Sequence, residues 1–325
     1  MLEERERSLL RTFKDYGKNR HKNIFKQVSF VGCMDKERLE VWYLKHYKKL
    51  MLFPMLILLI ALIYLSFFFS QTGDLFYKDV SLKGGISATV YTEKEVEINN
   101  IKNALGVDAE VRRLADFTTG RQLGFIVEVS DLAAEVLEEK LETFFGFELN
   151  EKNYSVEETG AKLGEAFTRQ LLLALAFAFV LMGITVFVTF RTFVPSGAVI
   201  FAALMDIAIP LALVDILKIP LSTAGIVGFL LIIGYSVDTD ILLTTSALKK
   251  REGSLFERMF RSMKTGLTMT LAAGGVMLIG LLFSTSVVIK EMFLIIMIAL
   301  VTDIFATYLT NAGILTWYCQ KKGIR

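Results

Sequence analysis

Long stretches without charge alternate with charged segments along this chain. Residues 50–73, 170–190 and 265–289 contain no Asp, Glu, Lys or Arg. Each stretch has at least the ~20 residues that a helix needs to cross the hydrocarbon of a membrane. Three further apolar stretches contain acidic but no basic residues: 195–217, 219–248 and 292–315. The pattern therefore predicts six membrane-spanning helices.

One long polar segment, residues 71–168, separates the first two predicted helices. Its alternating and helical patterns predict a strand, a helix, two strands, a helix and a weak last strand. These elements are expected at 86–91, 95–105, 109–114, 123–129, from an Asp131 cap to Phe145, and at 154–156. Gly106 and Gly146 follow the two helices as expected C-caps. This order is typical of a ferredoxin-like sandwich, so the fold class predicted is an α-helical membrane protein with six transmembrane helices and one external α+β domain.

The composition agrees with this class and excludes several functions. Hydrophobic residues make up 53% of the chain, and the mean hydropathy is +0.49. The formal net charge of +2 offers no basic surplus for nucleic-acid binding. Cys33 and Cys319 form no CxxC pair, and neither His21 nor His46 is near the acids of the apolar stretches in the sequence, so neither a metal site nor a cofactor is predicted. Because P-loop, GxSxG and HExxH motifs are absent, the chain is not expected to be an enzyme.

The basic residues predict the orientation in the membrane. Segments 1–49 and 246–265 contain 13 and 6 Lys and Arg residues, whereas the short loops on the other side contain only Lys218 and Lys290. Since basic loops favour the cytoplasmic side, both termini are expected there, with the long loop outside the cell membrane. The predicted organisation is a cytoplasmic segment 1–49, a membrane helix 50–70, an external domain 71–168, membrane helices 2–6 within 169–315, and a cytoplasmic C-terminus 316–325.

Acidic residues inside the predicted spans are the candidates for function: Asp206, Asp238, Asp240 and Asp303. A charged carboxylate at the bilayer centre costs ~2.5–3.5 kcal/mol, and such residues often mark ion or proton pathways. The alternative is a neutral Asp that joins helices by hydrogen bonds. Asp238 and Asp240 lie about 200° apart around one helix, so only one of them is expected to line a given path. Lys264 either serves orientation and contact with anionic lipid or places a counter-charge at the mouth of that path.

Four segments resemble the SecF family of protein-export membrane subunits, which is related to the resistance-nodulation-division transporters. They are GYSVDTDILL at 234–243, KTGLTMT at 264–270, LKGG at 82–85 and ETGAKLG at 158–164. Bacterial members have Asn-Asp after Gly-Tyr-Ser-Val, whereas this chain has Asp238-Thr239-Asp240, and Asp238 falls where SecD carries its own acid. Lys264 stands where bacterial members often have Arg. The short form, with its basic N-terminal segment, is similar to archaeal members.

The resemblance implies a subunit that pairs with SecD beside the Sec translocon and uses the proton motive force to assist the translocation of secreted chains. It also implies contacts with the translocating chains and with membrane lipids. The proton-coupling candidates are Asp238, Asp240, Thr239, Asp206, Asp303 and Lys264. Two alternatives stay open: a small-molecule or lipid exporter half of the same superfamily, and a subunit whose acids only hold its partner.

Overall fold

The computed structural model describes residues 38–116, 119–130, 132–250, 252–284 and 286–323. The chain divides into two compact units, Met1–Leu50 and Met51–Arg325. Most of the basic N-terminal segment considered above lies outside the described residues. The second unit contains the external domain and nearly all of the membrane helices.

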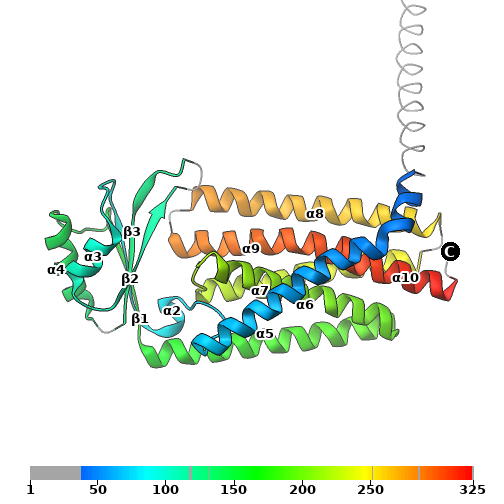
Figure 1. Ribbon diagram of the computed structural model, residues 1–325, viewed down its shortest axis with the longest axis horizontal. Helices are drawn as coiled ribbons and strands as arrows, with labels where there is room; N and C mark the ends of the chain where they lie inside the picture. The colour runs from blue at the N-terminus through cyan, green and yellow to red at the C-terminus, as the bar shows by residue number, and fades with distance from the viewer. Residues whose placement is uncertain (1–37, 117–118, 131, 251, 285, 324–325) are drawn as a thin grey trace, which may run out of the picture. The chain divides into compact units, whose positions relative to one another are not determined.

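Six helices of the described chain are long and apolar enough to cross a membrane, which confirms the predicted number. The first is Arg38–Thr72. The others are α5 (Ala161–Phe190), α6 (Phe193–Ile216), α7 (Thr223–Leu248), α8 (Leu255–Phe283) and a last span that begins as α9 (Val287–Phe305) (Figure 1). This last span continues through a π-helical segment, η1 (Ala306–Asn311), into α10 (Ala312–Lys322).

Several helix boundaries differ from those expected; the first span, for example, begins at Arg38, inside the segment 1–49. Helix α5 begins at Ala161, inside the segment assigned to the external domain, because a helix continues beyond the membrane wherever its sequence allows. The uncharged run 265–289 contains the end of α8, a turn that includes Ser284 and Ser286, and the start of α9. Serine favours turns without carrying charge, so a search for charges cannot find this turn.

The external domain has the predicted ferredoxin-like order. Its elements are β1 (Gly85–Tyr91), α3 (Ile98–Leu105), β2 (Ala109–Ala115), β3 (Gln122–Val129), α4 (Ala134–Phe145) and β4 (Tyr154–Thr159). The strands pair antiparallel in the order β2-β3-β1-β4. Strand β4 is longer than expected, and the N-cap of α4 is Ala133, without a side-chain hydrogen bond; the proposed Asp131 cap lies outside the described residues.

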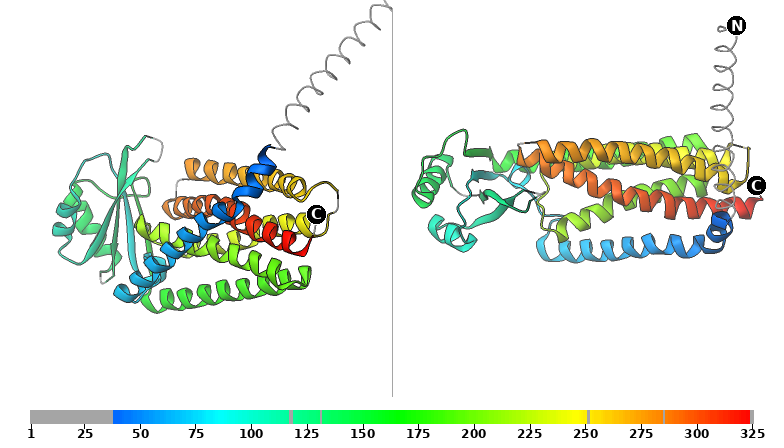
Figure 2. Two further views of the ribbon diagram at one scale, coloured as in Figure 1. Left: turned by 45° about the vertical axis from the view of Figure 1, so that its right-hand side comes forward. Right: turned by 90° about the horizontal axis from the view of Figure 1, so that it is seen from above.

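The two faces of this sheet have different surroundings. Alternate strand residues form an apolar core with α3 and α4, in which Phe125, Ile101 and Leu137 are fully buried. These helices cover the face that points away from the long helices, as the views in Figures 1 and 2 agree. The opposite face is polar, and a cleft of about 610 Å³ separates it from the turn between α8 and α9.

Two glycine segments of the sequence meet where the external domain joins the membrane helices. A Cβ atom on Gly84 would overlap the backbone of Ala161, and one on Gly164 would lie 2.8 Å from the Gly84 nitrogen. Gly84 also has a φ of +83°, which favours glycine. Thr168 on α5 donates a hydrogen bond to the Leu82 carbonyl at 3.0 Å. The double glycine therefore lets the short helix α2 (Val80–Lys83) and the first strand pack directly on the start of α5.

Candidate functional site

Three buried acidic side chains from three different helices meet inside the membrane bundle. Asp206 on α6 and Asp240 on α7 are fully buried, and Asp303 near the end of α9 is 1% exposed. The carboxyl groups of Asp206 and Asp303 interact with each other, and Asp240 interacts electrostatically with both. We call these three residues the acid cluster.

Hydroxyl and amide groups, rather than cations, hold the acid cluster. Ser236 donates a hydrogen bond to Asp206 Oδ2. Asn311 Nδ2 donates to Asp240 Oδ1 at 2.7 Å. The Thr307 hydroxyl lies 2.9 Å from Asp240 Oδ1 and 3.1 Å from Asp303 Oδ1. Because a hydroxyl has a single proton, Thr307 donates to one of these two acids at a time.

The local sequence explains why these groups converge. Ser236 and Asp240 are four residues apart on α7, so they share one face of that helix. Asp303, Thr307 and Asn311 repeat at the same spacing along the last span. Thr307 and Asn311 belong to η1, and π-helical segments inside α-helices occur frequently at functional sites.

One acceptor oxygen of each acid has no hydrogen-bond partner among the described residues: Asp206 Oδ1, Asp240 Oδ2 and Asp303 Oδ2. Nor does any described Lys, Arg or His form an ion pair with them. Three ionised carboxylates would repel one another strongly in this apolar surrounding. The acid cluster is therefore suited to taking up and releasing protons. Within the described residues, no group of three or more His, Cys, Asp or Glu is arranged to hold a metal ion.

The other sequence candidates lie outside the acid cluster. Asp238 is exposed on the surface of α7, whereas Thr239 is buried and donates to the Ser236 carbonyl of its own helix at 2.8 Å. Lys264 is exposed, and its ammonium group lies 5.0 Å from the centre of the Phe260 ring. Of the two neighbouring acids on α7, the structure thus places only Asp240 beside Asp206 and Asp303.

Sequence reasoning missed the donors of the acid cluster and its close neighbour Tyr308. For Thr307 and Asn311, the signal was a polar residue at every fourth position after Asp303 in a largely apolar span. Tyr308 is 8% exposed, and a Cβ atom on Gly266 would overlap its hydroxyl. Gly266 in the segment KTGLTMT therefore lets α8 pack against η1 beside the acids.

Comparison with known proteins gives consistent relatives. Residues 139–321 match the family model for the C-terminal part of the protein-export membrane proteins SecD and SecF. The protein-export membrane protein SecF of Methanocaldococcus jannaschii is 35% identical over 85% of this chain and 96% of its own length. The SecF of Methanothermobacter thermautotrophicus is 36% identical over 85% and 94%, and that of Pyrococcus furiosus is 32% identical over 90% and 98%.

A solved structure has the same fold. The crystal structure of SecDF from Thermus thermophilus, described as a translocon-associated membrane protein, matches with a TM-score of 0.66 at 22% identity. The match covers 85% of this chain but only 38% of the SecDF chain. The fold found here thus corresponds to one part of that longer protein.

Proposed function

This chain belongs to the SecF family of protein-export membrane proteins, and we propose that it works as one half of a complex whose other half is a SecD-type protein. The match to one part of the SecDF chain, 38% of its length, supports pairing of this fold with a SecD-type half. The pair would stand beside the Sec translocon and contact chains that emerge from it. Its work would be conformational, with no covalent bond of the exported chain made or broken.

The exposed Asp238 supports a partner within the membrane. Asp238 lies on an outward stripe of α7 together with Val227, Leu231 and Gly234. A Cβ atom on Gly234 would meet nothing within 4 Å, so a neighbouring helix can approach closely. A carboxylate left facing lipid costs ~2.5–3.5 kcal/mol at mid-bilayer, whereas a partner that donates a hydrogen bond removes much of this cost.

The acid cluster is the observation that supports use of the proton motive force by the complex. Its three carboxyl groups come from separate helices, and their donors are uncharged. When a proton enters or leaves, the Thr307 hydroxyl can change between Asp240 and Asp303, and the helices that carry them then repack. A change in protonation of a buried group can thereby shift the balance between two conformations.

The distribution of charge supports the orientation assigned to the chain. We place both termini in the cytoplasm and the external domain outside the cell membrane, with anionic lipids against the basic inner loops. Lys249 and Lys250 follow α7, and Arg258 and Arg261 lie in the first turns of α8, whereas Lys218 and Lys290 are the basic residues near the opposite ends of these helices. In this orientation α9 runs from the outside towards the cytoplasm, so its Asp303 lies deep in the membrane.

Replacement of two acids on the same helix tests the proposal. We expect Asp240→Asn to abolish the acceleration of export that a proton gradient produces, because it removes one titrating group from the acid cluster. Asp238→Asn is the matched control, and it should leave the acceleration in place while lowering recovery of the SecD-type partner. The measurement is the export rate of a secreted reporter with and without an imposed gradient, at equal amounts of complex.

Three results would argue against this function. Unchanged acceleration in Asp240→Asn, Asp206→Asn and Asp303→Asn would show that the acids only stabilise the bundle. Loss of acceleration in Asp238→Asn alone would indicate that Asp238, and not the acid cluster, couples export to the gradient. Co-purification with a transporter of small molecules or lipids, in place of a SecD-type protein, would favour the exporter alternative.

A further inference from the structure

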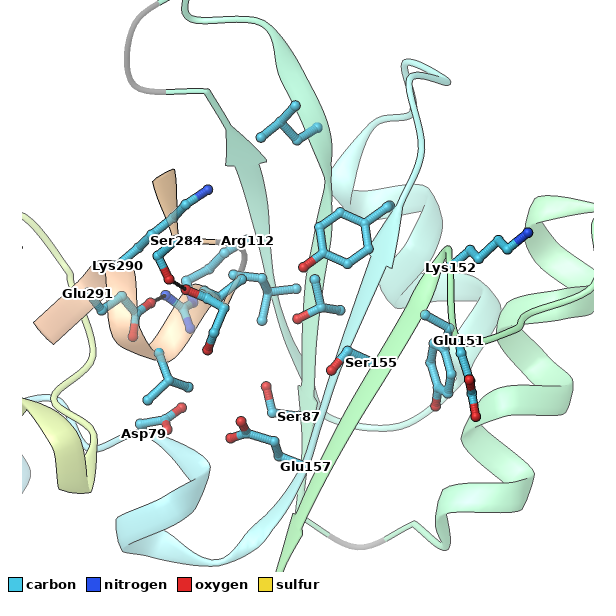
Figure 3. A pocket seen from close by; sticks show the side chains of 18 residues that line it. Asp79, Ser87, Arg112, Glu151, Lys152, Ser155, Glu157, Ser284, Lys290 and Glu291 are labelled. Carbon is cyan, nitrogen blue, oxygen red and sulfur yellow. Dashed lines mark hydrogen bonds and ion pairs between the residues drawn. The ribbon is translucent and has the colours of Figure 1, made fainter. Parts of the chain in front are cut away.

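One ion pair joins the polar face of the external sheet to the membrane helices. Arg112 on β2 donates to Glu291 Oε1 on α9 at 3.2 Å and to Glu128 Oε1 on β3 at 2.5 Å. Among the ion pairs of the described residues, Arg112–Glu291 is the one that connects the sheet with a membrane-spanning helix. Figure 3 shows Arg112 and Glu291 together at one edge of the cleft.

Glu128 fixes the position of Arg112 within the domain. Its side chain is 1% exposed, and Lys83 Nζ lies 3.5 Å from its second carboxylate oxygen. Glu128 therefore keeps the guanidinium group at the sheet surface even without Glu291. A pull on the Glu291 side would be transmitted to strands β2 and β3 together.

Helix α9 connects this ion pair directly with the acid cluster. Glu291 lies near the outer start of α9 and Asp303 near its inner end, and both belong to one continuous helix of 19 residues. The helical rise from position 291 to position 303 corresponds to ~18 Å. Directly after α9 the chain enters η1, which contains Thr307. A shift at the acid cluster can therefore move α9 as a rigid rod.

The external domain is attached at both edges of its sheet. Edge strand β4 leads through Gly160 into α5, where Gly84 and Gly164 make the contact tight. Edge strand β2 is joined to α9 by the ion pair between Arg112 and Glu291, beside the cleft. The order β2-β3-β1-β4 separates the two attachments by three strand spacings, or ~14 Å. Movement of α9 relative to α5 would thus rotate the sheet about its β4 edge.

We infer that Arg112 and Glu291 are positioning residues that transmit the state of the acid cluster to the external domain through α9. This inference rests on the proposed proton-driven function, but it adds a route that the acids alone do not provide. In this mechanism, movement of α9 opens or closes the cleft and swings the sheet on the outer side of the membrane.

A carboxylate-to-amide change tests the contact in the full complex. Glu291→Gln removes the charge that holds Arg112 to α9 while keeping the Arg112–Glu128 pair. We expect the gradient-dependent part of export to fall about fivefold, within the range typical of coupling energies, with export in the absence of a gradient unchanged. Glu110→Gln is the matched control, because Glu110 pairs with Lys83 at 3.6 Å and touches no membrane helix through an ion pair.

A cross-linking rate provides a readout that does not depend on export. Ser87 on β1 and Val288 on α9 line the cleft from opposite sides, so both can be changed to Cys in a chain that carries Cys33→Ser and Cys319→Ala. The rate of bridging by a bifunctional thiol reagent then reports cleft opening. We expect Asp303→Asn to change this rate about fivefold, and Glu291→Gln to remove that change in a double-mutant cycle. Glu110→Gln should leave it intact.

The two measurements separate the inference from the proposed function. If Asp303→Asn leaves the bridging rate unchanged, or changes it equally with and without Glu291→Gln, transmission through this ion pair is wrong. If Asp240→Asn abolishes gradient-dependent export while Glu291→Gln has no effect, the function stands and the route is wrong. If export never responds to the gradient, the proposed function fails, and the bridging rate still decides whether α9 links the two sites.

Discussion

Two groups of buried acids in this protein are stabilised in different ways. Glu128 in the external domain is enclosed by the cations of Arg112 and Lys83. Asp206, Asp240 and Asp303 in the membrane are enclosed by hydroxyl and amide groups, with no described cation in contact. A neighbouring cation favours the ionised form of an acid, whereas a neutral donor can serve an acid in either protonation state. The first arrangement is suited to holding two parts of the protein together, and the second to a change of protonation.

The difference also fits the surroundings of each group. The side chains of Arg112 and Lys83 are 22% and 34% exposed, so this charged network can be partly hydrated. The acid cluster has only apolar helices and a few polar side chains around it, and a fixed ion pair there would be costly to open again. Helix α9 carries one acid of the cluster, Asp303, near one end and Glu291, a partner of Arg112, near the other, so both arrangements meet along one helix.

The largest effect should come from removing the fixed cation. Arg112→Leu leaves Glu128 buried without its main partner, and we expect the external domain to lose about 2 kcal/mol, below the ~3–5 kcal/mol of fully buried pairs because Arg112 is 22% exposed. Asp240→Asn should cost less than ~1 kcal/mol, because Asn keeps an oxygen that accepts from Thr307 and Asn311. Thermal unfolding of the purified chain in detergent measures both. Equal losses in the two variants would remove the distinction drawn here, and Arg112→Leu with Glu128→Leu should recover much of the first loss.

A second prediction concerns the packing of α8 against η1 beside the acid cluster. Gly266→Ala places a methyl group against the Tyr308 hydroxyl, and we expect a loss of about 1.5 kcal/mol in stability, in the lower half of the range for overpacked sites. Tyr308→Phe in the same chain should restore part of it by removing the clashing oxygen. Gly274→Ala is the control, since a Cβ there meets nothing within 4 Å and alanine favours helix. A Gly266→Ala variant as stable as the Gly274→Ala variant would contradict this packing.

Sequence patterns predicted the helices and strands of the molecule better than the arrangement of the acid cluster. Missing charges identified six spans, and Gly106 and Gly146 marked helix ends, because both signals are local. The choice between Asp238 and Asp240 could not be made, because it depends on which side of α7 faces other helices. Segment η1 was equally hidden, since a π-helical turn results from packing and hydrogen bonding with neighbouring helices rather than from residue preference. For the same reason Thr307 and Asn311 escaped attention.

A third prediction isolates the neutral donor that the acid cluster uses. Thr307→Val keeps the shape of the side chain but removes the hydroxyl shared by Asp240 and Asp303, and we expect a loss of about 1 kcal/mol together with a weaker response of export to the gradient. Thr307→Ser should retain both properties, because it keeps the hydroxyl. Stability is measured by thermal unfolding, and the response by export rates at several imposed gradients. If the Val and Ser variants respond alike, the hydroxyl takes no part in coupling.

The smallest effect is a pH dependence of the external domain. Burial raises the pKa of Glu128 above its ordinary value of 4.5, although Arg112 and Lys83 act in the opposite direction. The folded domain therefore binds this proton more tightly than the unfolded chain does. The resulting stabilisation is fully present below pH 4.5 and is lost as the pH rises through the raised pKa. Relative to a Glu128→Gln variant, which cannot ionise, the parent should become less stable between acidic and neutral pH. Thermal unfolding of both chains in the same detergent across this range measures the difference, and parallel curves would mean that the two cations hold Glu128 ionised throughout.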